Sequence, residues 1–149
     1  MDAEAQVEGF IAKFSVEVAA QIRAARVAMR ERLPGAVELV YDNYNALAIG
    51  YGANDKVGGI VFSIAAYPRW ISLFFARGVE LDDPTGRLQG EGTKVRHIVL
   101  SHLAVLDEPD VRALMDQALA LAEPPIDSRG KARTLVKSVS ARQRPRQPA

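Results

Sequence analysis

The stretch over residues 81–98, LDDPTGRLQGEGTKVRHI, holds residue types that bind phosphates or metal ions: three glycines, two adjacent aspartates, a Thr-Lys pair and a histidine. A phosphate-binding loop places lysine directly after its last glycine, so that backbone amides and the ammonium group surround the phosphates. Here Thr93 separates the last glycine from Lys94, and Glu91 adds a negative charge. The dinucleotide-binding pattern also fails, because Val95 stands where its third glycine is needed. The stretch therefore predicts a turn and a sharp return into a strand, not a nucleotide site.

Carboxylates and histidines in the same region raise the question of a metal site. The residues are Glu80, Asp82, Asp83, Glu91, His97 and His102. Oxygen-rich groups suit hard cations such as iron or magnesium, whereas loop aspartates also serve as turn formers. The two histidines are five positions apart, so on a strand they face opposite sides and form no ready ligand pair. The spacing matches no dedicated metal motif.

Aromatic and basic residues on neighbouring strands favour a small-molecule pocket. The turn YDNYNA carries many hydrogen-bonding groups, although an Asx-stabilised turn with packed tyrosines would use the same residues. Aromatic bodies with polar tips suit a pocket wall, and a cation at the mouth can orient an anionic group. The candidate ligand-binding residues are Tyr41, Asn43, Tyr44, Trp70, Phe74, Arg77, Arg96 and His97. If these aromatics are only core, Arg77 instead pairs with a nearby acid at the surface.

Catalytic machinery is not indicated. The sequence has no cysteine, which excludes thiolate nucleophiles, disulfides and cysteine-ligated metals. Ser63, Ser72 and Ser101 lie on no nucleophile elbow, and no Ser/His/Asp order suggests a triad. No catalytic residue is predicted, and a non-enzymatic role is favoured.

Helices and a sheet must position these residues, and 149 residues are enough for one domain with its own core. Residues 2–14 predict a short helix with acids in its first turn. Ser15 can cap a second helix, in which Val18, Ile22, Ala25, Met29 and Leu33 form one apolar stripe. Five short runs rich in Val, Ile, Phe and Tyr follow between residues 37 and 100, and their short connections predict antiparallel strands.

The predicted sheet is apolar on both faces, because Trp70 and Phe74 alternate with Ile71 and Leu73 along one strand. Helices can cover one face, and the C-terminal tail or a second subunit can cover the other. Uncovered apolar surface favours association, so a homodimer is expected.

A last helix and a basic tail complete the chain. Asp107 is the expected N-cap, and Val111, Leu114, Met115, Ala118 and Ala122 form the buried stripe. Residues 127–149 carry seven basic and one acidic side chain, a net +6, against −5 for the other 126 residues. We therefore predict an α+β domain over residues 1–126, with an antiparallel sheet of five or six strands and helices at both ends. Residues 127–149 form a basic tail that adds one strand through TLVKSVS and then becomes disordered.

The acidic start of the chain and the lack of a long apolar stretch predict a cytoplasmic protein without a membrane segment.

Three segments of the sequence resemble the YdhG-like family, domain of unknown function 1801. They are VYDNYNALAIGYG, FSIAAYPRWISLFFARGVELDDPTGRLQGEGTKVRHI and KSVSARQRPR, and the resemblance runs from about Ser15 to Arg146. It implies a compact α+β fold similar to that of frataxin. The glycines and aspartates of residues 81–98 then look like a structural signature of the family.

The resemblance also implies iron as cargo, since some members of the family are described as intracellular iron chaperones. In frataxin-like proteins iron is associated with acidic residues on an early helix and a neighbouring strand. Glu4, Glu8 and Glu17 are the comparable acids here, whereas arginines on the second helix oppose an acidic iron surface.

Three functions therefore stay open. The favoured one is small-ligand binding in the aromatic and arginine pocket, and the second is frataxin-like iron delivery. The third is binding of an acidic partner or nucleic acid through the tail, which lacks the interleaved aromatic residues typical of nucleic-acid binding.

Overall fold

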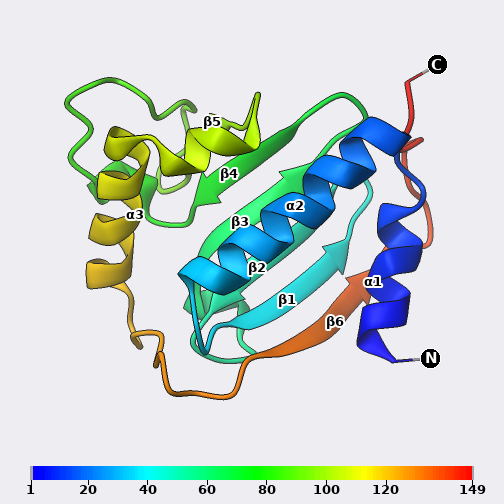
Figure 1. The fold of residues 1–149 in the computed structure, drawn as a ribbon, viewed down its shortest axis with the longest axis horizontal. Helices are drawn as coiled ribbons and strands as arrows, with labels where there is room; N and C mark the ends of the chain where they lie inside the picture. Colours follow the sequence, from blue (N-terminus) through cyan, green and yellow to red (C-terminus); the bar gives the residue numbers. More distant parts are fainter. Residues whose placement is uncertain (1, 149) are drawn as a thin grey trace.

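The computed structural model describes residues 2–148 as one α+β fold, in which three helices pack on a six-stranded sheet (Figure 1). The elements are α1 Ala3–Ile11, α2 Val16–Arg32, β1 Val37–Asp42, β2 Leu47–Gly52, β3 Ile60–Ala66, β4 Ile71–Phe75, β5 Arg96–Val99, α3 Pro109–Leu121 and β6 Arg133–Val139. Three short 3₁₀ turns lie at Val57–Gly59, Gly78–Glu80 and Leu103–Asp107. The predicted fold class is confirmed. No helix within residues 2–148 has the length and apolarity that crossing a membrane requires.

Side-chain caps begin both N-terminal helices, and that of α2 is the predicted Ser15, while α1 ends at Ile11, before the predicted end at residue 14. Asp2 accepts a hydrogen bond from the Ala5 amide at 2.8 Å, and Ser15 accepts one from the Val18 amide at 3.2 Å. Each cap satisfies one of the amides that a first helical turn leaves unpaired. The whole predicted stripe of α2 is buried against the sheet.

The start of α3 differs from the prediction by one residue. Glu108, not Asp107, occupies the N-cap position, because Pro109 is at the first helical position, where no amide donor is required. Asp107 ends the preceding 3₁₀ turn and pairs with Arg32 at 2.7 Å and Arg112 at 3.0 Å. The predicted apolar stripe of α3 is nevertheless buried.

The sheet has the order β5-β4-β3-β2-β1-β6. Strands β1 to β5 form the predicted antiparallel meander. Strand β6 pairs with β1 in parallel, which makes the sheet mixed. The parallel direction follows from the connection through α3, which returns the chain to the end of the sheet where β1 begins (Figure 1).

The C-terminal segment differs from the prediction of disorder beyond its strand. The backbone continues to pair after β6, from the Ser140 amide to the Asp42 carbonyl at 2.8 Å and from the Arg144 amide to the Tyr44 carbonyl at 2.9 Å. Arg146 is buried and donates to the carboxylate of Asp42 at 2.9 Å. Pairing of a buried carboxylate orders this segment, so residues 133–148 belong to the domain.

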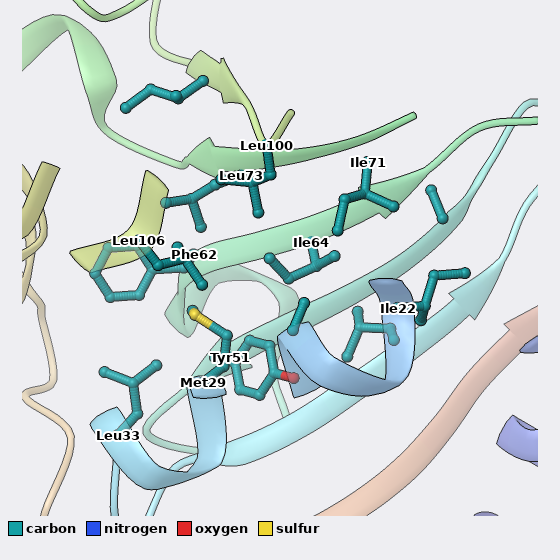
Figure 2. Packing of buried hydrophobic residues seen from close by; sticks show 14 of the residues in the cluster. Ile22, Met29, Leu33, Tyr51, Phe62, Ile64, Ile71, Leu73, Leu100 and Leu106 are labelled. Atoms are coloured by element: carbon teal, nitrogen blue, oxygen red, sulfur yellow. The ribbon is translucent and has the colours of Figure 1, made fainter. Parts of the chain in front are cut away.

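The core lies between α2 and one face of the sheet (Figure 2). Ile22 and Met29 of α2 belong to one buried cluster with Phe62 and Leu73 of the sheet. All three helices contribute to this one cluster, so they cover the same face. Side chains that alternate to the opposite face, such as Ser63 and Phe74, are outside this cluster, and the Val57–Gly59 turn borders a groove there.

Candidate functional site

A groove on the face opposite the helices is the main candidate site. We call it the open-face groove; it has a volume of about 400 Å³. Its lining residues are Asn43, Ala46, Ala48, Val57, Ile60, Ser63, Ala65, Tyr67, Phe74, Ala76 and Val95. Small residues on β2 and β3 form the floor, because alternation directs the large side chains of these strands into the core. Larger side chains from β4 and the surrounding loops form the walls.

Phe74 and His97 come together on this face, as neighbouring cross-strand residues of β4 and β5. Their rings stack, with centroids 5.0 Å apart and planes 25° apart. The backbone of His97 also pairs in both directions with Gln89, which fixes the strand at the groove's edge. Asn43 lines the groove with Phe74, so two of the predicted residues form the groove and His97 stacks on one of them.

Tyr41 lies on the same face, opposite Ala48 of the groove floor. Its hydroxyl is buried and has no hydrogen-bond partner among residues 2–148, and burial raises the pKa of this phenol. A buried hydroxyl without a partner costs free energy, but Tyr41 is not among the residues that line the groove.

Arg77 and Arg96 do not line the groove. Arg77 donates to Glu80 at 2.8 Å and to the Leu121 carbonyl, which matches the surface pair expected if the aromatics are only core. Arg77 lies beyond the end of β4 at Phe75 and begins the Gly78–Glu80 turn, so the alternation that directs Phe74 to the groove does not extend to it. Arg96 donates to the carbonyl of Val95 at 2.8 Å and so folds back on its own loop.

Trp70 lies in a second depression, which we call the end hollow, of about 630 Å³. Its lining residues are Asn45, Tyr67, Pro68, Arg69, Trp70, Arg144, Pro145, Gln147 and Pro148. Tyr67 stacks on Trp70 with centroids 4.8 Å apart and also lines the open-face groove. Sequence reasoning missed Tyr67. The signal was the turn YPRW, whose ends meet through a 2.9 Å bond from the Tyr67 amide to the Trp70 carbonyl.

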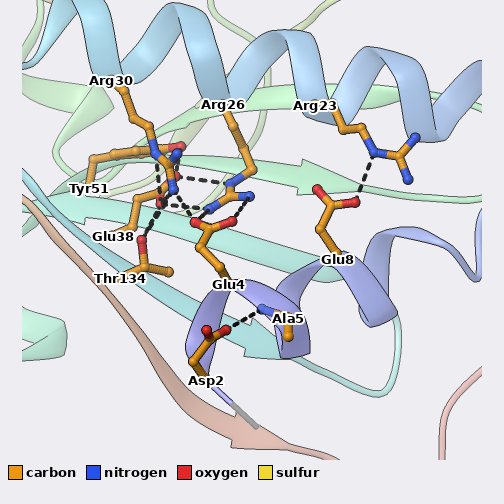
Figure 3. Close-up of polar contacts among 10 residues, drawn as sticks. All are labelled: Asp2, Glu4, Ala5, Glu8, Arg23, Arg26, Arg30, Glu38, Tyr51 and Thr134. Carbon is orange, nitrogen blue, oxygen red and sulfur yellow. Dashed lines mark hydrogen bonds and ion pairs between the residues drawn. The ribbon is translucent and has the colours of Figure 1, made fainter.

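A buried ionic cluster around Glu38 was also missed (Figure 3). The Glu38 side chain accepts from Arg26 at 2.9 Å, Arg30 at 2.7 Å, Tyr51 at 2.6 Å and Thr134 at 2.8 Å. Burial alone would raise the pKa of Glu38, but the hydrogen bonds from Arg26 and Tyr51 outweigh it and lower the pKa to about 2. Burial and the adjacent Glu38 carboxylate raise the pKa of Tyr51 well above its usual value. These contacts join α2, β1, β2 and β6, so the cluster is structural.

The acids expected for iron are placed differently. Glu4 pairs with Arg26 at 2.7 Å, and Glu8 pairs with Arg23 at 3.0 Å (Figure 3). Glu17 lies in the first turn of α2 and is exposed. Within residues 2–148 no three His, Cys, Asp or Glu side chains gather as a metal site would need. The geometry therefore offers no support for iron on this surface.

Residues 81–98 form the turn and return that their pattern predicts. The Asp83 carboxylate accepts from the amides of Arg87 and Leu88, each at 2.9 Å. Gly86 and Gly90 have positive φ angles of 68° and 120°, which glycine adopts without strain. The Asp83 carboxylate thus binds the backbone amides of Arg87 and Leu88, so these amides are not free to bind a phosphate.

The low pKa of Glu38 predicts a stability change in acid. A carboxyl whose pKa is 4.5 when unfolded and about 2 when folded stabilises the fold above pH 4.5. That contribution, about 3 kcal/mol, is lost as the pH falls toward 2. Urea unfolding across this range should show the loss in the wild type and a flatter profile in Glu38→Gln. Asp42 also has a lowered pKa and contributes to the loss in both proteins. The contribution of Glu38 is therefore the difference between the wild-type and Glu38→Gln profiles. Parallel profiles would contradict the prediction.

Comparison with protein-family models, with curated proteins and with solved structures gives no match to this chain.

Proposed function

We propose that this protein binds a small, largely apolar ligand in the open-face groove, without catalysing a reaction. The observation that carries the proposal is the groove itself, a preformed depression on a sheet face that the helices leave open. Its volume falls within the range of about 300–1,000 Å³ that is typical of ligand sites.

The lining residues indicate the kind of ligand. None of them is charged, and the side-chain polar groups are those of Asn43, Ser63 and Tyr67. Phe74, braced by His97, offers a ring against which a flat ligand can stack. A neutral aromatic molecule with one or two polar groups fits this surface better than the anion that we expected from Arg77.

The same lining favours binding over catalysis. It includes the hydroxyls of Ser63 and Tyr67 but no histidine or carboxylate to act as a general base. The alternative of iron delivery rests only on the resemblance to the YdhG-like family. Glu4 and Glu8, the acids that it would use, are paired with arginines.

Replacing Phe74 by alanine is expected to weaken binding about three- to tenfold, since an aromatic pair contributes roughly 0.5–1.5 kcal/mol beyond its buried area. The measurement is NMR titration of the ¹⁵N-labelled protein with a set of neutral aromatic fragments. Wild-type shifts should concentrate on Asn43, Ser63 and Tyr67. Val99→Ala is the matched control, because Val99 is on the same face but outside the groove.

Fragment shifts that cluster elsewhere, or an equal effect of both substitutions, would contradict the proposal. The expected homodimer is tested in the same samples by sedimentation equilibrium. A second copy seated on this face would close the groove, and Phe74→Ala would then weaken the dimer instead of fragment binding.

A further inference from the structure

Three segments that are distant in sequence meet at the end hollow. They are the β1–β2 turn with Tyr44 and Asn45, the β3–β4 turn from Tyr67 to Trp70, and residues 144–148. Figure 1 shows the C-terminal segment at the end of the sheet where β1 ends and β4 begins. The hollow is thus built by the tertiary fold and is separate from the floor of the open-face groove.

Two large aromatic side chains are exposed here. Trp70 is 44% exposed and Tyr44 is 46% exposed. Tyr67 braces the indole of Trp70 by stacking at an interplanar angle of 19°, so the orientation of the exposed ring is fixed. Rings held rigidly at the surface lose little conformational entropy when a flat ligand stacks on them.

The positive charges at the hollow have no acidic partners. Arg69 and Arg144 line the hollow and form no ion pair with any residue in the range 2–148, and the Arg144 guanidinium lies 5.5 Å from the centre of the Tyr44 ring. Arg146, two residues on, is buried against Asp42 and holds the segment in place. The buried arginine therefore keeps Arg144 beside the aromatic rings before any ligand binds.

We infer that the end hollow binds single-stranded nucleic acid, with a base stacked on Trp70 and phosphates contacting Arg69 and Arg144. In the linear sequence the tail arginines lack aromatic neighbours, but folding supplies them from two turns of the sheet. Exposed rings interleaved with unpaired cations are the combination that sequence-tolerant single-strand binding uses. A duplex hides its base faces, so an unpaired strand is the required ligand. The inference does not depend on the proposed function.

Trp70 is the only tryptophan of the chain, so its fluorescence reports on the hollow directly. The first experiment is titration with an oligothymidylate of about ten nucleotides, a length suited to a single site. Stacking should quench the tryptophan emission in a saturable way. Binding should weaken with rising salt, with a log–log slope of about −0.7 for each phosphate contact. A duplex of the same length, thymidine monophosphate and inorganic phosphate are the comparison ligands.

Variants are compared by the anisotropy of a labelled oligothymidylate, after circular dichroism confirms that each is folded. Trp70→Ala is expected to lower the affinity about tenfold, the scale of one stacked base. Arg144→Ala and Arg69→Ala should each lower the affinity and reduce the salt slope by about 0.7. Arg129→Ala is the matched control. Arg129 precedes β6, which begins beside the end of β1 that is opposite the hollow. The substitution removes the same charge and should change neither the affinity nor the salt slope.

Absence of quenching and of binding at micromolar protein would overturn the inference. Equal losses for Arg129→Ala and Arg144→Ala would also overturn it, since they would show diffuse attraction to the tail. Duplex binding as tight as single-strand binding, or monophosphate binding as tight as oligonucleotide binding, would exclude a single-strand site.

Discussion

A chain that ends at Pro125 is expected to lose its cooperative fold at 25 °C. The truncation removes β6, so the edge of β1 loses its whole ladder of backbone partners. It also removes Arg146 from the fully buried carboxylate of Asp42, leaving Lys13 as its cation. Loss of a partner from a buried ion pair alone costs about 3–5 kcal/mol, against a total stability of about 5–15 kcal/mol for a domain. Far-ultraviolet circular dichroism with thermal melting measures the effect.

The matched control is a chain that ends at Arg146, which keeps β6 and the pair with Asp42. It should melt within a few degrees of the wild type. A cooperative transition of the shorter chain near the wild-type temperature would show that residues 126–149 are dispensable. The expected unfolding also means that this truncation cannot test whether the tail binds nucleic acid, so the point substitutions above are needed.

Replacing Arg26 by methionine is expected to lower the free energy of unfolding by about 3 kcal/mol. Arg26 is 4% exposed and holds both Glu38 and Glu4, and methionine keeps its aliphatic bulk without the charge. The loss lies at the lower end of the range for a broken buried pair, because Arg30 and Tyr51 still donate to Glu38. Urea unfolding at pH 7 measures the change.

Arg23→Met on the same helix is the control. Arg23 pairs with Glu8 at the surface, where both side chains are about half exposed, so the expected cost is at most about 1 kcal/mol. Adding Glu38→Gln to Arg26→Met should recover part of the loss, because it removes a buried charge that has lost one of its two arginine partners. Equal effects of the two single substitutions would contradict a special role for the Glu38 cluster.

Local patterns predicted most of the fold. The Ser15 cap, the α2 stripe and the strands of the meander depend on residues close together in sequence. The parallel pairing of β6 could not be predicted in the same way, because it depends on a connection that contains α3. The ordering of the tail was missed because it depends on Arg146 reaching an aspartate 104 residues away.

The sequence predicted the candidate site less well. The register of β4 with β5 brings Phe74 and His97 together. Arg77 lies beyond the end of β4, and its pairing with Glu80 depends on the turn that follows, which the strand pattern does not predict. Glu38 could not be identified, since a glutamate in an alternating strand also fits a solvent-facing position. What buries it are partners 12, 13 and 96 residues away.

The pairing of β1 with β6 has a consequence for the order of events during synthesis. Glu38 and Thr134 are 96 residues apart, so at about 5–20 residues per second a ribosome makes β1 roughly 5–20 s before its partner. Throughout that interval the outer edge of β1 presents unpaired amides and carbonyls, the kind of edge on which chains aggregate. The nascent chain therefore depends on translation speed and on chaperone shielding more than a protein whose sheet closes in chain order. The sheet edge at β1 is closed only when β6 pairs with it and Arg146 reaches Asp42.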